Sequence, residues 1–212
     1  RVTVIDFPGH GKSGFPPEEG WTVDDYCTFT AAFIEQTGIS GCDIIAHSFG
    51  GRVALYLAAN EPQLVKRLVL TGCAGIKKPQ TPEQQKRSAR YQRLKGLYQS
   101  LGRVAPLKGL SDQLLGKLRQ KYGSPDYNAL SEDMKKTFVK VVNEDLSPLL
   151  PRVQASTLLV WGENDTETPL WMGQQMEKEI PDAGLVIFEN DDHFAYLRQW
   201  PRFVRVVQAF LK

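Results

Sequence analysis

The 212-residue sequence contains few cysteines and no long hydrophobic run. Its three cysteines are an odd number, which argues against a full disulfide framework and favours a reducing compartment, so we expect a cytoplasmic protein. No uncharged apolar run approaches the roughly 18 to 20 residues that a membrane helix needs, so we expect no stable membrane insertion. With 42% hydrophobic and 24% charged residues, the composition excludes a disordered chain and indicates a globular one.

The sequence also lacks a large net charge, because 26 Lys and Arg residues nearly balance 24 Asp and Glu residues. This balance is not the electrostatic footprint of a nucleic-acid-binding protein. The distribution is uneven, since residues 76–145 carry 15 basic and 7 acidic side chains. A solvated helical face is the simpler interpretation of this basic segment. An alternative stays open, in which one or two of its arginines attract a substrate carboxylate.

Short apolar runs alternate with helical patterns at both ends of the chain. Thr22 opens a helix, and Asp25 stands three residues later, as a capping box requires. Further helices are expected over residues 50–60 and after Pro201. Because strands alternate with helices, we predict an α/β fold with a mainly parallel sheet flanked by helices. The strands are expected at residues 2–6, 43–46, 67–71, 157–161 and 185–188.

Residues 76–148 interrupt this alternation. They are rich in Gln, Lys and Arg and contain no strong strand pattern. Two apolar stripes recur at helical spacing there. The stripes consist of Tyr91, Leu94, Leu97, Tyr98 and Leu101, and of Leu130, Met134, Phe138 and Val142. We therefore expect a small insertion of three or four helices that separates residues 1–75 from residues 149–212.

Ser48 lies where the strand at residues 43–46 runs directly into a helix. Ala46 stands two residues before it and Gly50 two residues after it. A serine raised on a sharp strand-to-helix turn has a strained backbone and presses its neighbours at these positions together, so only small residues fit. The turn exposes the hydroxyl and directs helix N–H groups at whatever the serine attacks. The plainer alternative is an N-capping serine, but the combined pattern favours a nucleophile.

A serine hydroxyl is a poor nucleophile unless a base accepts its proton, and the chain has only three histidines. His47 is adjacent to Ser48, on the opposite side of the turn, and His10 in the first turn is better suited to packing or to hydrogen bonding within its loop. His193 follows the last predicted strand and is therefore the candidate base. A lone loop histidine is more often a surface residue, so this choice depends on elimination.

The base needs an acidic residue that fixes its tautomer. Asp165 follows the strand at residues 157–161, again at a carboxyl end. Asp191 and Asp192 are too close to His193 in sequence to reach its far nitrogen, and Glu163 is the nearest rival. The order Ser, Asp, His along the chain is one of the known arrangements of this triad.

Four motifs together resemble the α/β-hydrolase superfamily, and in particular its single-domain serine hydrolases with a helical cap. The resemblance implies that residues 76–148 form the cap between two parts of the core. Ser48 separates the chain from the dehalogenase and epoxide-hydrolase branches, which have Asp there. Two departures are Ala46, where the first Gly of the turn is usual, and Asp192, where Gly usually precedes the His. The motifs are residues 6–13 (DFPGHGKS), 46–51 (AHSFGG), 161–165 (WGEND) and 192–194 (DHF).

The resemblance also implies that this sequence begins at the fourth strand of the family's sheet. A His-Gly loop after the third strand supplies half of the family's oxyanion hole, and the N–H of Phe49 is then the remaining donor. We expect a piece of a longer protein or a truncated member. The strand at residues 43–46 would have an unpaired edge, through which a second copy or a complementing N-terminal segment would pair.

The expected activity is that of a serine hydrolase acting by acyl transfer on a small carboxylic ester or related carbonyl substrate. Ser48 attacks, His193 carries the proton and Asp165 orients His193. No metal or organic cofactor is implied, because no cluster of residues has ligand spacing. Two alternatives stay open: carbon–carbon bond hydrolysis of dienoic acids by the same triad, and a non-catalytic binding protein. The substrate pocket is expected to include His47, Trp161 and Trp171.

Overall fold

A four-stranded parallel sheet forms the centre of the computed structural model, which describes the whole chain except the side chains of residues 125 and 126. Neighbouring strands follow one another in the order β1-β2-β3-β4, and all three pairings are parallel. The predicted fold class is confirmed. The strands are β1 (Cys42–His47), β2 (Val65–Thr71), β3 (Ser156–Gly162) and β4 (Ala183–Phe188).

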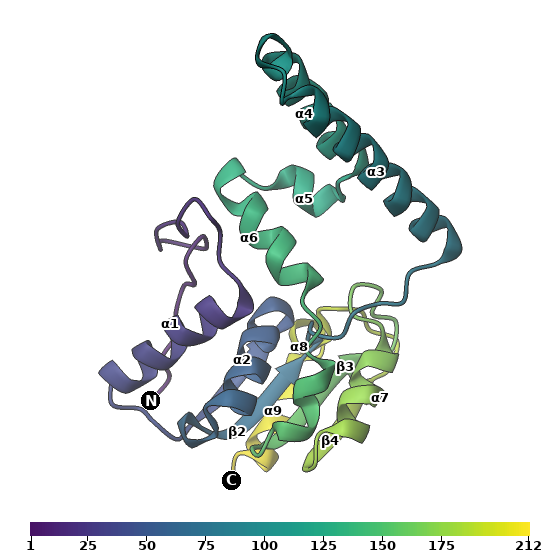
Figure 1. Cartoon of the computed structure of the whole chain (residues 1–212). Coiled ribbons are helices and arrows are strands. Elements are labelled where there is room, and N and C mark those ends of the chain that lie inside the picture. Colours follow the sequence, from purple (N-terminus) through teal and green to yellow (C-terminus); the bar gives the residue numbers. More distant parts are fainter.

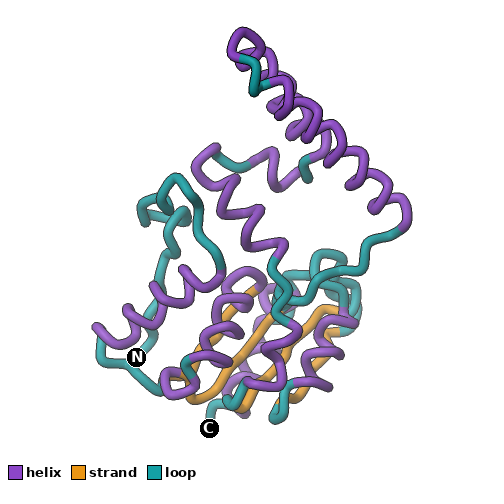
Figure 2. The backbone as a smooth tube through the Cα atoms, viewed as in Figure 1, coloured by secondary structure: helices purple, strands orange, loops and turns teal.

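Helices cover both faces of this sheet (Figure 1, Figure 2). Side chains alternate between the two faces along each strand, so Leu159 packs into the cluster with α2 and α7, while Leu158 and Val160 pack into the cluster with α9. The core helices are α1 (Val23–Gln36), α2 (Ser48–Asn60), α7 (Leu170–Glu179), α8 (Ala195–Arg198) and α9 (Trp200–Phe210). Short 3₁₀ turns are η1 (Pro62–Leu64), η2 (Ala105–Leu107) and η3 (Ser147–Arg152).

The start of α1 follows the predicted capping box. The Thr22 hydroxyl accepts from the Asp25 N–H, and the Asp25 carboxylate accepts from the Thr22 N–H at 2.7 Å. One turn later Tyr26 is fully buried, and its hydroxyl donates to the Pro8 carbonyl at 2.9 Å. Helix α1 therefore anchors the first turn of the chain to the core.

Four helices lie between β2 and β3. Helices α3 and α4 form a hairpin that projects away from the sheet, and α6 lies nearer to the core (Figure 1). Tyr91 of the predicted stripe on α3 packs against Tyr122 of α4, with ring centroids 5.6 Å apart, but no residue of α3 is buried and Leu97 is 56% exposed. In α6 the buried side chains are Met134, Thr137 and Val141, whereas the predicted Val142 is exposed. The four helices are α3 (Pro82–Leu101), α4 (Lys108–Tyr122), α5 (Pro125–Ala129) and α6 (Glu132–Asn143).

The strand predicted at residues 2–6 is wrong. Val2 and Val4 are 90% and 85% exposed, and this segment pairs with no strand in the described part of the chain. A strand is stabilised by hydrogen bonds to a neighbouring strand, and an apolar run without such a neighbour does not hold the conformation. The sheet therefore ends at β1, where Ile45 is 53% exposed, and β1 has the unpaired edge that was expected for residues 43–46.

Among the described residues, no helix combines the length and the apolar character needed to cross a membrane.

Candidate active site

Ser48 occupies a strained backbone position at the junction of β1 and α2. Its φ is 48°, in the left-handed region that residues other than glycine rarely adopt. The preceding residue, His47, takes the extended N-cap position of α2 and forms no side-chain cap. Ser48 therefore does not have the geometry of an N-capping serine. It has the geometry of a serine raised on a strand-to-helix turn.

The residues on either side of this turn approach each other as their spacing predicts. A Cβ added at Gly50 would lie 3.8 Å from the Ala46 Cβ, which is ordinary van der Waals contact. Because this contact is not a clash, the Ala46 methyl group is tolerated in place of glycine at this position.

Phe49 supports the turn through its ring and offers its backbone to the site. The ring packs edge-on against Phe7 and Tyr26 and stacks on His10, with centroids 5.1 to 5.7 Å apart. His10 therefore has the packing role that its position predicts. The N–H of Phe49 lies in the first turn of α2, where N–H groups have no acceptor within the helix. It is available to an anionic oxygen beside Ser48.

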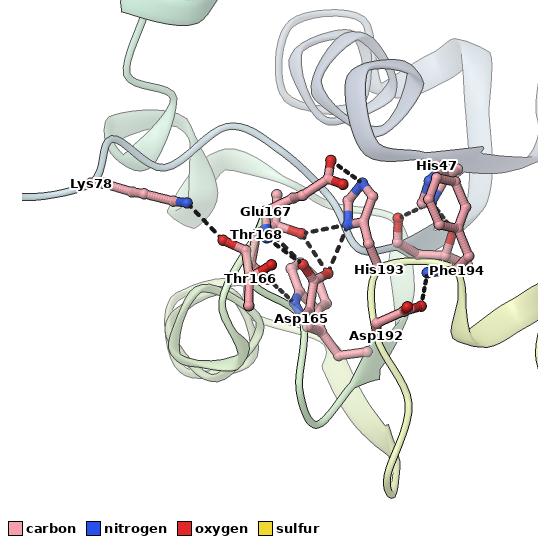
Figure 3. A network of polar contacts seen from close by, with 11 residues as sticks. His47, Lys78, Asp165, Thr166, Glu167, Thr168, Asp192, His193 and Phe194 are labelled. Carbon is pink, nitrogen blue, oxygen red and sulfur yellow. Dashed lines mark hydrogen bonds and ion pairs between the residues drawn. The ribbon is translucent and has the colours of Figure 1, made fainter. Parts of the chain in front are cut away.

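Asp165 lies in the loop between β3 and α7, and its carboxylate is surrounded by donors (Figure 3). One oxygen accepts from the N–H groups of Glu167 at 2.9 Å and Thr168 at 2.8 Å. The other accepts from the Thr168 hydroxyl at 2.8 Å and lies 2.8 Å from His193 Nδ1. Burial raises the pKa of Asp165, but the hydrogen bonds from His193 and Thr168 outweigh burial and leave this pKa below its ordinary value. The carboxylate is therefore held in its charged form.

His193 is buried beside Asp165, with 6% of its surface exposed. Burial lowers the pKa of His193, but the hydrogen bond to Asp165 and the charges of Asp165, Glu167 and Asp192 outweigh burial, so the pKa is raised. Its other nitrogen, Nε2, lies 3.6 Å from the Glu167 carboxylate. In the described part of the structure, no hydrogen bond joins His193 to the Ser48 hydroxyl.

Two glycines allow the backbone to approach this pair closely. A Cβ added at Gly72, which follows β2, would lie 3.0 Å from His193 Nδ1 and 3.2 Å from an Asp165 oxygen. A Cβ added at Gly162, the last residue of β3, would lie 2.7 Å from the Asp191 carbonyl oxygen. Any side chain at these two positions would displace the imidazole or the loop that carries it.

His47 lies beside the imidazole of His193. Its sequence position predicts only that it lies on the opposite side of the turn from Ser48. The two rings are 4.6 Å apart, and His47 Nδ1 lies 3.0 Å from the Thr71 carbonyl oxygen. Because a carbonyl only accepts, Nδ1 is the donor in this contact. Burial and the charge of His193 lower the pKa of His47. A neutral His47 therefore packs against the ring of His193, and its role in a substrate pocket stays a prediction.

The other two predicted pocket residues differ in exposure. Trp161 is fully buried, and its indole donates to the Thr168 carbonyl at 2.6 Å, so it supports the Asp165 loop from within the core instead of lining a pocket. Trp171, at the start of α7, is 37% exposed, and its pocket role stays a prediction. A cavity of about 940 Å³ lies between α3, α4 and α6, and its walls include none of Ser48, Asp165 and His193.

Sequence reasoning missed Gly72, Glu167 and Thr168. A signal for the turn after Asp165 was present, because an aspartate carboxylate commonly accepts backbone N–H groups of the residues that follow it. No comparable signal pointed to Glu167 or Gly72. Among the described residues, no group of three His, Cys, Asp or Glu side chains lies together in a way that could hold a metal ion.

A family model described as alpha/beta hydrolase fold matches residues 1–198. Over 222 residues the chain is 25% identical to a 2-hydroxy-6-oxononadienedioate/2-hydroxy-6-oxononatrienedioate hydrolase from Pseudomonas sp, covering 100% of this chain and 77% of that protein. Over 217 residues it is 28% identical to the 2-hydroxymuconate semialdehyde hydrolase of Pseudomonas putida, covering 100% of this chain and 76% of that protein. These hydrolase relatives argue against the non-catalytic alternative.

Solved structures share the same fold. A meta-cleavage product hydrolase from Pseudomonas fluorescens IP01 matches with a TM-score of 0.66 and 20% identity, over 97% of this chain and 77% of that chain. An esterase from Exiguobacterium antarcticum matches with a TM-score of 0.69 and 21% identity, over 97% of this chain and 79% of that chain. Both matches concern the fold, and they leave the substrate open.

Proposed function

The chain is a hydrolase that belongs to the α/β-hydrolase fold family, and we propose that it cleaves a bond beside a substrate carbonyl by acyl transfer through Ser48, His193 and Asp165. The observation that carries this proposal is the buried pair of Asp165 and His193. The pair lies at the carboxyl end of the sheet, where Ser48 has its left-handed backbone. Ser48 follows β1, Asp165 follows β3 and His193 follows β4. In a parallel sheet the carboxyl ends of these strands lie at the same end of the sheet.

Each residue has a defined task in this reaction. The Ser48 oxygen attacks the carbonyl carbon while His193 Nε2 accepts its proton, and Asp165 stabilises the resulting imidazolium through Nδ1. The oxygen of the tetrahedral intermediate accepts from the Phe49 N–H. His193 then returns the proton to the departing group, and water releases the acyl group from Ser48 in the same way. For the first step, Nε2 must form a hydrogen bond with the Ser48 hydroxyl, which is absent in the described part of the structure.

For the substrate we propose a planar, conjugated acid of the 2-hydroxy-6-oxo-dienoic class. The support is the activity of the two hydrolase relatives, whose matches span this whole chain. In such a substrate the bond that breaks is carbon–carbon, and the proton on His193 goes to the departing carbon. A small carboxylic ester is the second candidate, because the triad and one oxyanion donor supply all the acid and base groups that ester hydrolysis needs.

The test combines active-site labelling with a product assay. A fluorophosphonate should label wild-type protein and not Ser48→Ala, whereas Ser100→Ala, which removes an exposed hydroxyl from α3, should label normally. Turnover of a 2-hydroxy-6-oxo-dienoic acid and of p-nitrophenyl acetate should both require Ser48, and the larger kcat/KM identifies the substrate class. If wild type is neither labelled nor active on either substrate, the proposed function is wrong.

A further inference from the structure

Glu167 contacts the nitrogen of His193 that the reaction needs. Its carboxylate lies 3.6 Å from Nε2, while the Asp165 carboxylate lies 2.8 Å from Nδ1 (Figure 3). His193 therefore has a carboxylate beside each ring nitrogen. The triad mechanism uses only the one at Nδ1, and it leaves the carboxylate at Nε2 without a role.

The two carboxylates differ in how firmly they are held. The Asp165 side chain is fully buried and accepts hydrogen bonds from Glu167, Thr168 and His193, so it stays in place. The Glu167 side chain is 65% exposed, and His193 is its only polar partner among the described residues. Its backbone is fixed by the N–H that donates to Asp165 at 2.9 Å. The carboxylate of Glu167 can therefore leave the imidazole without breaking any other contact.

Contact with Glu167 and activation of Ser48 exclude each other. Nε2 carries one proton or one lone pair, and it cannot direct that position at both side chains. When His193 is protonated, its Nε2–H is attracted by the Glu167 carboxylate. When His193 is neutral, the attraction is lost and Nε2 is available to accept the Ser48 proton.

We propose that Glu167 is a positioning residue that holds the protonated imidazole of His193 turned away from Ser48 and so makes the hydrolase less active at low pH. This inference rests on the proposed function, because it assigns the accepting nitrogen to Nε2. It concerns a side chain that directs the base, and it gives Glu167 no contact with the reacting atoms.

Other charged groups facing His193 act differently. Asp192, on the same loop, is paired with Arg198 at 2.6 Å, so part of its charge is neutralised. His47, from the end of β1, lies against the ring and opposes the imidazolium when it is itself charged. Lys78 donates to the Thr166 carbonyl at 3.1 Å, on the side of the Asp165 loop that is away from His193 (Figure 3). Glu167 is the carboxylate of this group that contacts Nε2.

The experiment compares pH profiles of kcat/KM for wild type and Glu167→Gln on p-nitrophenyl acetate, an uncharged substrate. We expect the midpoint of the acid limb to move down by about half a unit to one unit, because one carboxylate about 4 Å away is removed in a solvated setting. Activity at pH 6 rises several-fold and the plateau changes little. In 1 M NaCl the shift shrinks, since an exposed charge is screened. Glu35→Gln, which removes an exposed carboxylate at the end of α1, leaves the profile unchanged.

A second readout does not need turnover. The imidazole of His193 can be titrated by NMR in a Ser48→Ala background, with and without Glu167→Gln. A lower midpoint in the double variant supports the inference even if neither substrate is cleaved, in which case only the proposed function fails. An unchanged midpoint overturns the inference. So does a Glu167→Gln profile that loses its plateau without moving its midpoint, because that result assigns Glu167 a structural or substrate-binding role.

Discussion

Gly72 is the backbone position at which a single methyl group should separate catalysis from stability. It follows β2 with a φ of 47°, and its N–H donates to the Val160 carbonyl at 3.1 Å. In Gly72→Ala the new Cβ would lie 3.0 Å from His193 Nδ1 and 3.2 Å from an Asp165 oxygen. Both distances are shorter than a methyl group normally tolerates, so the hydrogen bond between the two side chains has to move.

Two effects of this substitution can be worked out separately. The left-handed backbone costs an alanine about 1 kcal/mol relative to glycine, which corresponds to a Tm decrease of about 2 to 4 °C for a domain of this size. The contact displaces the imidazole by a few tenths of an ångström. Because a misplacement of about 1 Å costs roughly 100-fold in rate, we expect kcat/KM to fall by about 10-fold.

Gly38→Ala provides the matched control. Gly38 has a φ of 66°, and no atom lies within 4 Å of its added Cβ, so this variant carries the backbone strain without the contact. Thermal unfolding should show similar Tm decreases for both variants, while steady-state kinetics on p-nitrophenyl acetate should show a loss for Gly72→Ala alone. If Gly72→Ala keeps full kcat/KM, then the pair formed by His193 and Asp165 does not serve the reaction.

Three further substitutions address the same site. Asp165→Asn should lower kcat by about 10⁴-fold in the ester assay, because it removes the charge that orients His193. The pKa of Asp165 is lowered on folding, so the ionised side chain stabilises the fold above the ordinary pKa of 3.8, and this stabilisation is lost as the pH falls through the folded-state pKa. Acid unfolding of Asp165→Asn should lack this pH dependence. Identical acid transitions of the wild type and the variant would contradict this role of Asp165. Thr168→Val removes the hydroxyl that donates to Asp165 at 2.8 Å, and kcat should fall about 10-fold with KM unchanged; a change confined to KM would count against this role. Gly162→Ala forces its methyl group against the Asp192 carbonyl, so calorimetry should show a loss of roughly 2 kcal/mol or more, and an unchanged Tm would refute the close approach.

The features predicted correctly from the sequence are those in which cause and effect lie a few residues apart. The capping box of Thr22 and Asp25 involves one helical turn. The strained turn at Ser48 was predicted from its neighbours two residues away, since steric crowding at that spacing follows from the backbone path alone. The pairing of Asp165 with His193 is not local, but both follow strands of one parallel sheet, and such strands present their carboxyl ends at a common edge.

Pairing of a segment with its neighbours could not be predicted in the same way. Residues 2–6 have the apolar pattern of a strand, and the pattern describes a preference that only an adjacent strand can satisfy. The stripe on α3 has correct helical spacing, but spacing does not specify what covers it, and in the structure α3 buries no residue. The error at residues 2–6 arose because strand formation depends on partners elsewhere in the fold, while periodicity describes only the segment itself. The helix at α3 was predicted correctly, but its lack of burial could not be predicted for the same reason.

Glu163 and Glu167 illustrate the same limit inside the site. Sequence proximity to the end of β3 makes Glu163 the nearest rival to Asp165, but its carboxylate accepts from the Asn190 N–H at 2.9 Å and joins two loops. Glu167 reaches His193 because the Asp165 carboxylate accepts N–H groups from two and three residues later, which curls the loop back over the imidazole. Glu163 and Glu167 lie only four residues apart, but only Glu167 contacts His193 in the described part of the structure. The direction of the loop decides this difference, and that direction depends on the hydrogen bonds of Asp165.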